Sequence, residues 1–364
     1  MLSKFAVKNF RGFKEKLELN LAFHKDYEFN SFAIKDDLVK NGIIYGPNGS
    51  GKTNLGLAIF DIVNLLTNRF QKADYYLNFA NAETPDAPVE FEYAFKLGED
   101  MVSYKYSRAS NLFLITEEMR VDDREVFYRD RSEFRLSSEY KISKLQKNMI
   151  MSSVNHVPVV NYLIASYPLK QDHYLLRLKN FVESMLWFRC LDTREFIGLE
   201  NSSTNIDEFI ISNDLLNDFS GFLADVSEQH FVFPEESNKG RNLFCRIGSK
   251  DVLFDDIAST GTESLKLLYY WVKRMNDASF VFIDEFDAFY HFRLAASVCR
   301  RLFSQDAQIF LSSHNTFLTQ NDLLRPDCNF LLKDNEVKPL CNCTDKELRF
   351  GNNIEKLYRG GAFN

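Results

Sequence analysis

The chain has 364 residues, of which 45% are hydrophobic and 26% charged. This length suits about two compact units, each with a buried core, and the composition is that of an ordinary globular protein. The formal net charge of −7 argues against a surface that binds nucleic acid everywhere, although it leaves room for one basic patch. No segment approaches the ~18 apolar residues of a membrane span, and residues 1–10 lack the apolar block of a signal peptide. We therefore expect a cytoplasmic protein without a membrane partner, and scattered cysteines that stay reduced.

The N-terminal residues predict two strands joined by a turn. Apolar residues alternate around Phe5 and Val7 and again from Leu17 to Leu21, and the turn lies at Asn9–Phe13. Arg11 belongs to this turn. It is either a surface arginine or a cation that contacts a bound phosphate group, and the sequence favours neither.

A glycine-rich loop follows. Residues Gly46–Thr53 read Gly-Pro-Asn-Gly-Ser-Gly-Lys-Thr and match the pattern G-x-x-x-x-G-K-[ST]. In this pattern glycines let backbone N–H groups point at phosphate oxygens, the lysine reaches the β- and γ-phosphates, and the final hydroxyl binds Mg²⁺. The flanking residues suit a buried strand at 41–45 and a helix with one apolar face at 54–66. We predict a nucleoside triphosphate site rather than a structural turn. Its expected ligands are Gly46, Asn48, Gly49, Ser50, Gly51, Lys52 and Thr53, with Thr53 also a metal ligand.

The middle of the chain changes character at about residue 117. Before it, alternation at 89–95, 102–106 and 112–115 predicts an antiparallel meander. After it, arginines are interleaved with acids, lysines follow at helical spacing, and residues 174–188 predict a long helix. We interpret 117–242 as a mainly helical insert between two halves of a core. Its basic residues either face solvent, the commoner case, or bind nucleic acid if they share one face.

The second half of the core begins with a predicted hairpin over 243–254. It leads to Ser259-Thr260-Gly261-Thr262-Glu263 at the start of a predicted helix. Hydroxyl residues and glycine at a helix start also describe an ordinary N-cap, so this segment alone proves little.

Two apolar strands in this half end in polar residues. The run Phe280–Ile283 is followed by Asp284 and Glu285, and residues 307–313 are followed by His314. In open α/β sheets ligands bind at the carboxyl ends of the strands. We expect Asp284 to orient a Mg²⁺ ion, Glu285 to polarise an attacking water and His314 to sense the γ-phosphate. The alternative is a pair of acids in a turn and a structural histidine.

Taken in order, these motifs resemble the ABC-type ATPase head of SMC, RecF-like and OLD-family proteins and of ATPases in bacterial antiphage and abortive-infection systems. Gly46–Thr53 is similar to the Walker A loop, Ser259–Glu263 to the signature motif, Phe280–Glu285 to Walker B, and His314 to the switch histidine. The segments 9–13, 287–291 and 354–361 also resemble this group. The signature departs from the transporter form Leu-Ser-Gly-Gly-Gln, which disfavours a transporter subunit, and no Q-loop glutamine can be placed.

The resemblance implies an α/β fold, an ABC-type P-loop ATPase head with a mixed sheet, a flanking antiparallel sheet and a mainly helical insertion. The implied domains are 1–116, 117–242 and 243–364. The implied cofactors are ATP and Mg²⁺, and Lys52, Glu285 and His314 are the implied catalytic residues. Two heads would form a homodimer or a larger assembly. Each ATP would then lie between the phosphate loop of one chain and Ser259, Gly261 and Thr262 of the other.

The implied function is that of an ATP-hydrolysing switch that controls a separate effector, such as a nuclease or toxin, in antiphage defence. DNA or a phage protein would be the trigger. The alternative is a DNA-repair or maintenance ATPase of RecF or SMC type that acts on DNA directly, which requires a basic channel and hydrolysis stimulated by DNA. A scaffold that binds ATP without hydrolysing it is disfavoured by the adjacent Asp284 and Glu285.

Overall fold

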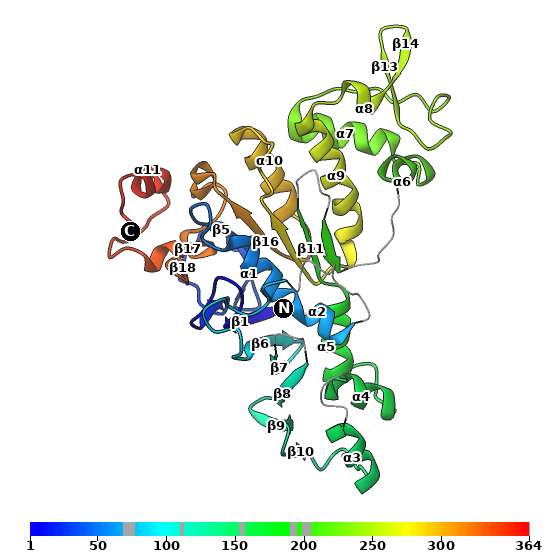
Figure 1. The fold of residues 1–364 in the computed structure, drawn as a ribbon. Helices are drawn as coiled ribbons and strands as arrows, with labels where there is room; N and C mark the ends of the chain where they lie inside the picture. Colours follow the sequence, from blue (N-terminus) through cyan, green and yellow to red (C-terminus); the bar gives the residue numbers. More distant parts are fainter. Residues whose placement is uncertain (68–76, 110–112, 153–156, 190–194, 199–204, 364) are drawn as a thin grey trace.

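The computed structural model describes residues 1–67, 77–109, 113–152, 157–189, 195–198 and 205–363. These residues form two seven-stranded sheets and two short hairpins, with helices between and around the sheets (Figure 1). The short hairpins are β3 (Ile34–Lys35) with β4 (Leu38–Val39) and β13 (Phe244–Ile247) with β14 (Lys250–Leu253).

The central sheet carries the predicted nucleotide motifs. Its strands, in spatial order, are β12 (Phe196–Gly198), β11 (Leu186–Arg189), β15 (Phe280–Asp284), β16 (Gln308–Ser313), β5 (Asn41–Tyr45), β17 (Asn329–Lys333) and β18 (Glu336–Pro339). The strands from β11 to β17 are parallel, and the edge strands β12 and β18 are antiparallel to their neighbours. Every residue of β5, β15 and β16 is buried, as expected for parallel strands covered on both faces. The sheet is therefore mixed, as predicted.

The second sheet is antiparallel throughout. Its order is β10 (Phe134–Leu136), β9 (Arg124–Arg129), β8 (Leu114–Val121), β7 (Asp100–Arg108), β6 (Val89–Leu97), β1 (Leu2–Lys8) and β2 (Leu17–Asn20). Buried and partly exposed residues alternate along all of β6, which is the pattern of a strand with one covered face. This sheet confirms the predicted meander and the predicted N-terminal strand pair.

Helices α1 (Lys52–Ile59) and α2 (Asp61–Leu66) lie between the two sheets. On one side, a Cβ atom added to Gly56 would lie 2.8 Å from the Phe282 ring and 2.9 Å from Trp187 Nε1 in the central sheet. On the other side, Tyr93 of the antiparallel sheet donates its hydroxyl to the carbonyl oxygen of Ala58 at 3.1 Å. The helix that follows the phosphate loop is thus held from both faces.

A buried glutamine also joins the sheets. Gln308 of β16 accepts a hydrogen bond from the backbone N–H of Leu2 at 2.8 Å and donates to the carbonyl oxygens of Leu2 and Val39, both at 2.9 Å. All four hydrogen-bonding groups are buried, so this amide fixes β1 against the central sheet.

The remaining helices form two groups and two single helices. Beside the antiparallel sheet, to its right in Figure 1, lie α3 (Lys144–Ser152), α4 (Val159–Ser166) and α5 (Tyr174–Glu183). At the opposite end lie α6 (Ile206–Ser212), α7 (Leu216–Ser227), α8 (Phe254–Ile257) and α9 (Thr260–Arg274). The single helices are α10 (Phe292–Phe303), between β15 and β16 in the chain, and the C-terminal α11 (Ile354–Arg359).

The prediction of a mainly helical segment from residue 117 is wrong for its first part, because residues 114–136 form β8, β9 and β10. Charged side chains interrupt the apolar alternation in these strands. Arg129 is buried against Glu117, with 2.7 Å between guanidinium nitrogen and carboxylate oxygen, and Arg135 pairs with Glu125 at 2.9 Å. These arginines therefore pair with acids in the sheet, which weakens the case for a nucleic-acid face.

The prediction of a single helix over 174–188 is also wrong. The helix α5 ends at Glu183, and Leu186–Arg189 forms β11, which pairs in parallel with β15. Three apolar residues suit a buried strand as well as a helix end, and their burial beside β15 decides between the two.

The end of the molecule that contains α9 includes part of the predicted insert. Lys266 of α9 donates to Asp207 of α6 at 2.7 Å, and Phe219 of α7 packs on Tyr269 with 4.9 Å between ring centroids. Residues on both sides of position 242 thus share one core. The division into 1–116, 117–242 and 243–364 stays a prediction, and residues 199–204 lie outside the described residues.

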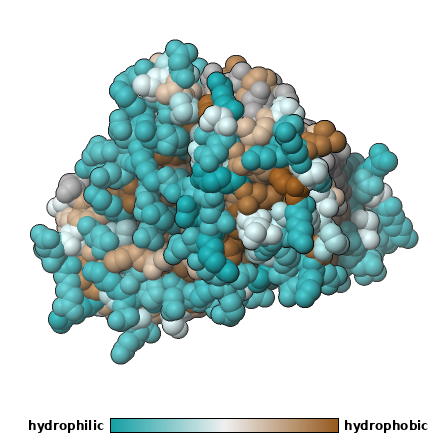
Figure 2. All heavy atoms as spheres, turned by 90° about the horizontal axis from the view of Figure 1, so that it is seen from below, coloured by the Kyte–Doolittle hydropathy of each residue, from teal (hydrophilic) through white to brown (hydrophobic). Residues whose placement is uncertain are grey.

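Among the described residues no helix has the length and apolar character needed to cross a membrane. Figure 2 shows the lower end of the molecule, where separate apolar areas lie between hydrophilic side chains. Cys245, Cys299, Cys328, Cys341 and Cys343 are free thiols, and Cys190 lies outside the described part of the chain.

Candidate nucleotide-binding site

The loop Gly46–Thr53 connects β5 to α1 in a conformation that requires glycine. Gly49 and Gly51 have φ values of 79° and 100°, which side chains rarely allow. A Cβ atom on Gly46 would lie 2.5 Å from the carbonyl oxygen of Leu332, and one on Gly51 would lie 2.8 Å from the Phe13 ring. Backbone geometry and close packing therefore both explain the glycines, and Asn48 and Gly49 are exposed at the loop tip.

The side chain of Lys52, the first residue of α1, reaches back to the start of the phosphate loop. Its ammonium group donates to the carbonyl oxygens of Gly46 at 2.9 Å and Pro47 at 3.2 Å. Burial lowers the pKa of Lys52, and the carboxylates of Asp284 and Glu285 oppose this shift. The charge is thus held where the glycine-rich loop would surround a phosphate group.

Thr53 and Asp284 meet at the carboxyl end of the central sheet. The Thr53 hydroxyl donates to Oδ2 of Asp284 at 2.8 Å, and the Ser312 hydroxyl donates to Oδ1 at 2.7 Å. Asp284 is fully buried, so each of these hydrogen bonds helps to retain a charge that would be costly without partners. Since β5, β15 and β16 are parallel neighbours, their ends bring these residues together from distant parts of the chain.

A hydroxyl and a carboxylate are ligands that suit Mg²⁺, which also keeps waters and phosphate oxygens in its shell. Within the described residues no group of three or more His, Cys, Asp or Glu side chains is arranged to hold a metal ion. Thr53 and Asp284 therefore fit a magnesium ion that arrives with a nucleotide, rather than an ion bound by the protein alone.

Glu285 and His314 border the same place. Glu285 has a φ of 49°, an uncommon value for a residue with a side chain, and its N–H donates to the Ser312 hydroxyl at 2.8 Å. Such backbone conformations are concentrated at functional sites. Nδ1 of His314 lies 3.4 Å from the Lys52 ammonium nitrogen. An ammonium group can only donate, so Nδ1 is placed to accept from Lys52 when the proton of a neutral ring lies on Nε2.

Sequence reasoning missed Arg189. This residue ends β11, and its Nε lies 3.2 Å from Oδ2 of Asp284 while Nη2 lies 3.3 Å from Oγ1 of Thr53. The same guanidinium lies 3.9 Å from a carboxylate oxygen of Glu285. An arginine directly after the apolar run Leu186–Phe188 was the available signal, but the prediction placed that run in a helix.

Asp287 also lies near the site, and the sequence predicted no role for it. It accepts a hydrogen bond from the Ser313 hydroxyl at 2.7 Å. Burial raises the pKa of Asp287, whereas the hydrogen bond from Ser313 lowers it. This carboxyl links the segment after β15 to the end of β16, next to His314.

Arg11 lies beside the first turn of α1. Its Nη1 donates to the side-chain oxygen of Asn54 at 3.4 Å, and its φ of 48° places it in the tight turn predicted from the sequence. The packing of Phe13 against Gly51 brings the whole turn to the phosphate loop. A contact between Arg11 and nucleotide stays a prediction.

The predicted signature segment begins α9 in another part of the molecule, beside α7 and α8 (Figure 1). The Ser259 hydroxyl caps the helix by accepting from the Thr262 N–H at 3.2 Å, and Ser259 and Thr260 are exposed. Thr262 is buried, and its hydroxyl donates to Gln229 at 3.1 Å. A Cβ atom on Gly261 would lie 3.2 Å from the carbonyl oxygen of Phe289, so the first turn packs closely on the segment after β15.

Comparisons with known proteins give fold likenesses without close relatives. No family model matches the chain, and no curated protein gives a significant match. An SMC head domain from Thermotoga maritima is 15% identical over 93% of this chain and 97% of that chain, with a TM-score of 0.45. An SMC head bound to the C-terminal winged-helix domain of ScpA is 15% identical over 93% and 96%, with a TM-score of 0.48. An SMC head from Pyrococcus furiosus with an extended coiled coil, bound to the C-terminal domain of ScpA, is 13% identical over 93% and 95%, with a TM-score of 0.42.

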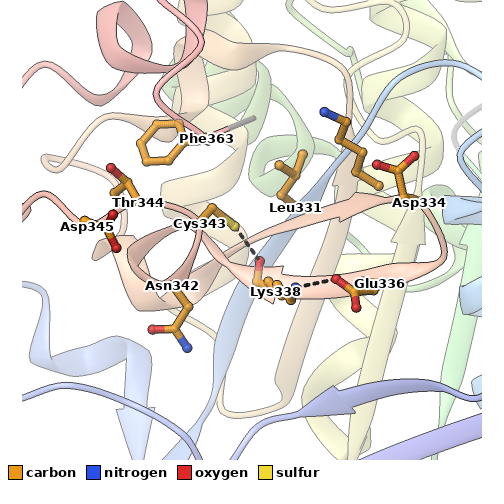
Figure 3. Close-up of a pocket in the computed structure, with 10 residues that line it drawn as sticks. Leu331, Asp334, Glu336, Lys338, Asn342, Cys343, Thr344, Asp345 and Phe363 are labelled. Atoms are coloured by element: carbon orange, nitrogen blue, oxygen red, sulfur yellow. Dashed lines mark hydrogen bonds and ion pairs between the residues drawn. The ribbon is translucent and has the colours of Figure 1, made fainter.

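A separate pocket of about 360 Å³ lies at the β17–β18 edge of the central sheet. Figure 3 shows Lys338 paired with Glu336 and Cys343 beside them. Its lining contains both cationic and anionic side chains, and none of the predicted site residues belongs to it. This pocket therefore adds nothing to the nucleotide site.

Proposed function

We propose that the protein is an ATPase that binds Mg²⁺-ATP between two copies of itself and uses hydrolysis as a switch. The observation that carries this proposal is the convergence of Lys52, Thr53, Asp284, Glu285 and His314 at the carboxyl ends of β5, β15 and β16. A phosphate loop, a metal-binding carboxylate and a further acid that can position a water are groups suited to phosphoryl transfer to water.

Each residue has a distinct role in this proposal. Backbone N–H groups of the loop and Lys52 bind the β- and γ-phosphates, and Thr53 and Asp284 hold the magnesium ion. When bound there, the ion would supply positive charge to neutralise the charge that develops on the phosphate oxygens. Glu285, which is partly exposed, accepts a proton from the attacking water. His314 donates a hydrogen bond from Nε2 to the γ-phosphate.

The second half of each site comes from the partner copy. Ser259 and Thr260 are exposed at the N-terminus of the 15-residue helix α9, where the helix dipole favours an anion. The γ-phosphate then bridges two chains, and hydrolysis removes the bridge. Nucleotide state controls dimer stability in this way.

The wider role we propose is control of an effector protein, a nuclease or toxin, in antiphage defence. Support comes from the sequence, in which the order of motifs and the closing segment 354–361 resemble ATPases of such systems. That segment forms α11, whose Arg359 packs over Phe317 next to the His314 segment, 5.6 Å from the ring centroid. Through this contact, a change at His314 on nucleotide binding would reach the C-terminal helix α11.

The test is the Glu285→Gln variant. We expect ATP binding to persist and hydrolysis to slow by about 10²- to 10⁴-fold, because the general base is lost. An ATP-dependent dimer should then accumulate, measured by light scattering coupled to size exclusion. Lys52→Ala is the matched control and should neither bind ATP nor dimerise. A Glu285→Gln protein that is equally monomeric with and without ATP would contradict the proposal.

The same preparation separates the switch from an ATPase that acts on DNA. Double-stranded DNA is added to the wild-type protein while hydrolysis is measured at two salt concentrations. We expect no stimulation. A salt-sensitive increase in turnover would instead favour the repair or maintenance role, since phosphate contacts weaken as salt rises.

A further inference from the structure

Arg189 places a positive charge against both of the side chains expected to hold magnesium. Its guanidinium contacts Oδ2 of Asp284 at 3.2 Å and Oγ1 of Thr53 at 3.3 Å. Thr53 in turn donates to the same Oδ2 atom at 2.8 Å. The three side chains thus form a closed set of contacts at the end of β5, β11 and β15.

These contacts compete directly with a magnesium ion. Oδ1 of Asp284 is engaged by Ser312, and Oδ2 is engaged by Thr53 and Arg189. A divalent cation binds oxygen ligands at about 2.0–2.1 Å and would repel a guanidinium that touches the same oxygens. A Mg²⁺ ion bound directly to Oδ2 and Arg189 in its observed position would therefore disfavour each other.

We infer that Arg189 is a resident cation that holds the magnesium ligands in the nucleotide-free protein and is displaced when Mg²⁺-nucleotide binds. This inference rests on the proposed function and adds a regulatory step to the same site. Two carboxylates are in reach of the displaced side chain. In the observed position the Arg189 nitrogens lie 3.8 Å from an oxygen of Glu195 and 3.9 Å from an oxygen of Glu285.

The burial of the partners separates this arrangement from an ordinary surface ion pair. The Arg189 side chain is 24% exposed, whereas that of Asp284 is 0% exposed and cannot be compensated by solvent. Lys52 also places a positive charge near Asp284, but a buried carboxylate is stabilised best by a positive charge in direct contact with it. Arg189 supplies that charge until the metal replaces it.

The test is Arg189→Gln, which keeps a polar side chain and removes the charge. Binding of a non-hydrolysable fluorescent ATP analogue is measured by anisotropy over a series of Mg²⁺ concentrations and in EDTA. We expect the Mg²⁺ midpoint to fall by about tenfold, because the competing charge-assisted hydrogen bonds are gone. In EDTA the variant should bind the analogue more weakly than wild type, since wild type keeps a cation beside Asp284.

Arg177→Gln is the matched control. Arg177 is 33% exposed and pairs with Asp100 on the antiparallel sheet, away from the phosphate loop. Its removal should leave the Mg²⁺ midpoint unchanged. Two results would overturn the inference: an unchanged midpoint in Arg189→Gln, or equal weakening with Mg²⁺ and in EDTA, which identifies Arg189 as a simple phosphate ligand. Failure of the wild-type protein to bind the analogue at all would instead refute the proposed function.

Discussion

At the scale of single residues, the charge of His314 decides how the site faces a phosphate. Burial lowers the pKa of His314 below its usual 6.5, and the nearby Lys52 lowers it further, while Glu285 opposes the shift. Because the unfolded chain takes up the proton first as pH falls, the neutral form contributes to stability above about pH 6.5. That contribution is lost progressively below pH 6.5. His314 is therefore neutral at physiological pH.

The His314→Ala variant tests the sensor role. We expect turnover to fall by about 10²-fold, because a hydrogen bond to the transferring phosphate is lost, while ATP affinity changes little. Wild-type turnover should be flat above pH 7 and should change only below about 6.5, where the imidazole gains its proton. Steady-state hydrolysis and equilibrium binding measured over this pH range provide the check. Full turnover in the variant would reject the role.

The residues Lys52, Thr53, Asp284 and Glu285 could be predicted because each belongs to a short contiguous motif. The structure adds the contacts that the motif cannot contain. Arg189 was missed because its partners lie 136 and 95 positions away in the chain, so no local pattern records the contact.

At the scale of elements, the phosphate loop depends on how closely α1 approaches the central sheet. Gly56 permits that approach, since an added Cβ atom would lie under 3.0 Å from Phe282 and Trp187. Gly221 in α7 is a useful contrast, because an added Cβ atom would meet no atom within 4 Å there. Both glycines lie in helices and differ in their surroundings.

Gly221→Ala should therefore stabilise the protein, whereas Gly56→Ala should leave its stability unchanged or lower. In both, alanine gains about 1 kcal/mol of helix propensity. At position 56 overpacking of about 1–3 kcal/mol exceeds or cancels that gain, and the shift of α1 should also weaken ATP binding. Denaturant unfolding and nucleotide titration measure the two effects. A stabilised Gly56→Ala protein with unchanged ATP affinity would show that α1 can move without cost.

Elements marked by short local patterns could be predicted from the sequence, whereas elements that depend on contacts between strands could not. Strands 41–45 and 280–284 and the hairpin at 244–253 were predictable from short apolar runs and turns. The strands in residues 117–136 could not be predicted, because their charged side chains pair with residues on neighbouring strands. Those pairs can be identified only when the order of the strands is known.

At the scale of the whole molecule, the proposed function requires a second chain to complete each site. The phosphate loop and the start of α9 lie in different parts of the same chain (Figure 1). In a symmetric dimer the phosphate loop of each chain would lie against the start of α9 of the other chain, because both partners use the same surface.

Mixing two inactive variants tests this arrangement. Lys52→Ala removes phosphate binding, and Thr260→Glu places a negative charge against the γ-phosphate while suiting the helix dipole of α9. Each variant alone should be inactive. If the two chains pair at random, half of the dimers in an equal mixture contain both chains and have one intact site, which gives about a quarter of the wild-type rate. No recovery after mixing would mean that each chain completes its own site.

The sequence by itself determined the phosphate loop, the acidic strand end, the histidine strand end and the α/β class, because these depend on residues adjacent in the chain. Only the tertiary structure decided that residues 117–136 join a sheet, that Leu186–Arg189 lies beside β15, and that Arg189 contacts both Thr53 and Asp284. The physical reason is that strand pairing and ion pairing across long loops depend on which distant segments are buried together. Local periodicity does not record that choice.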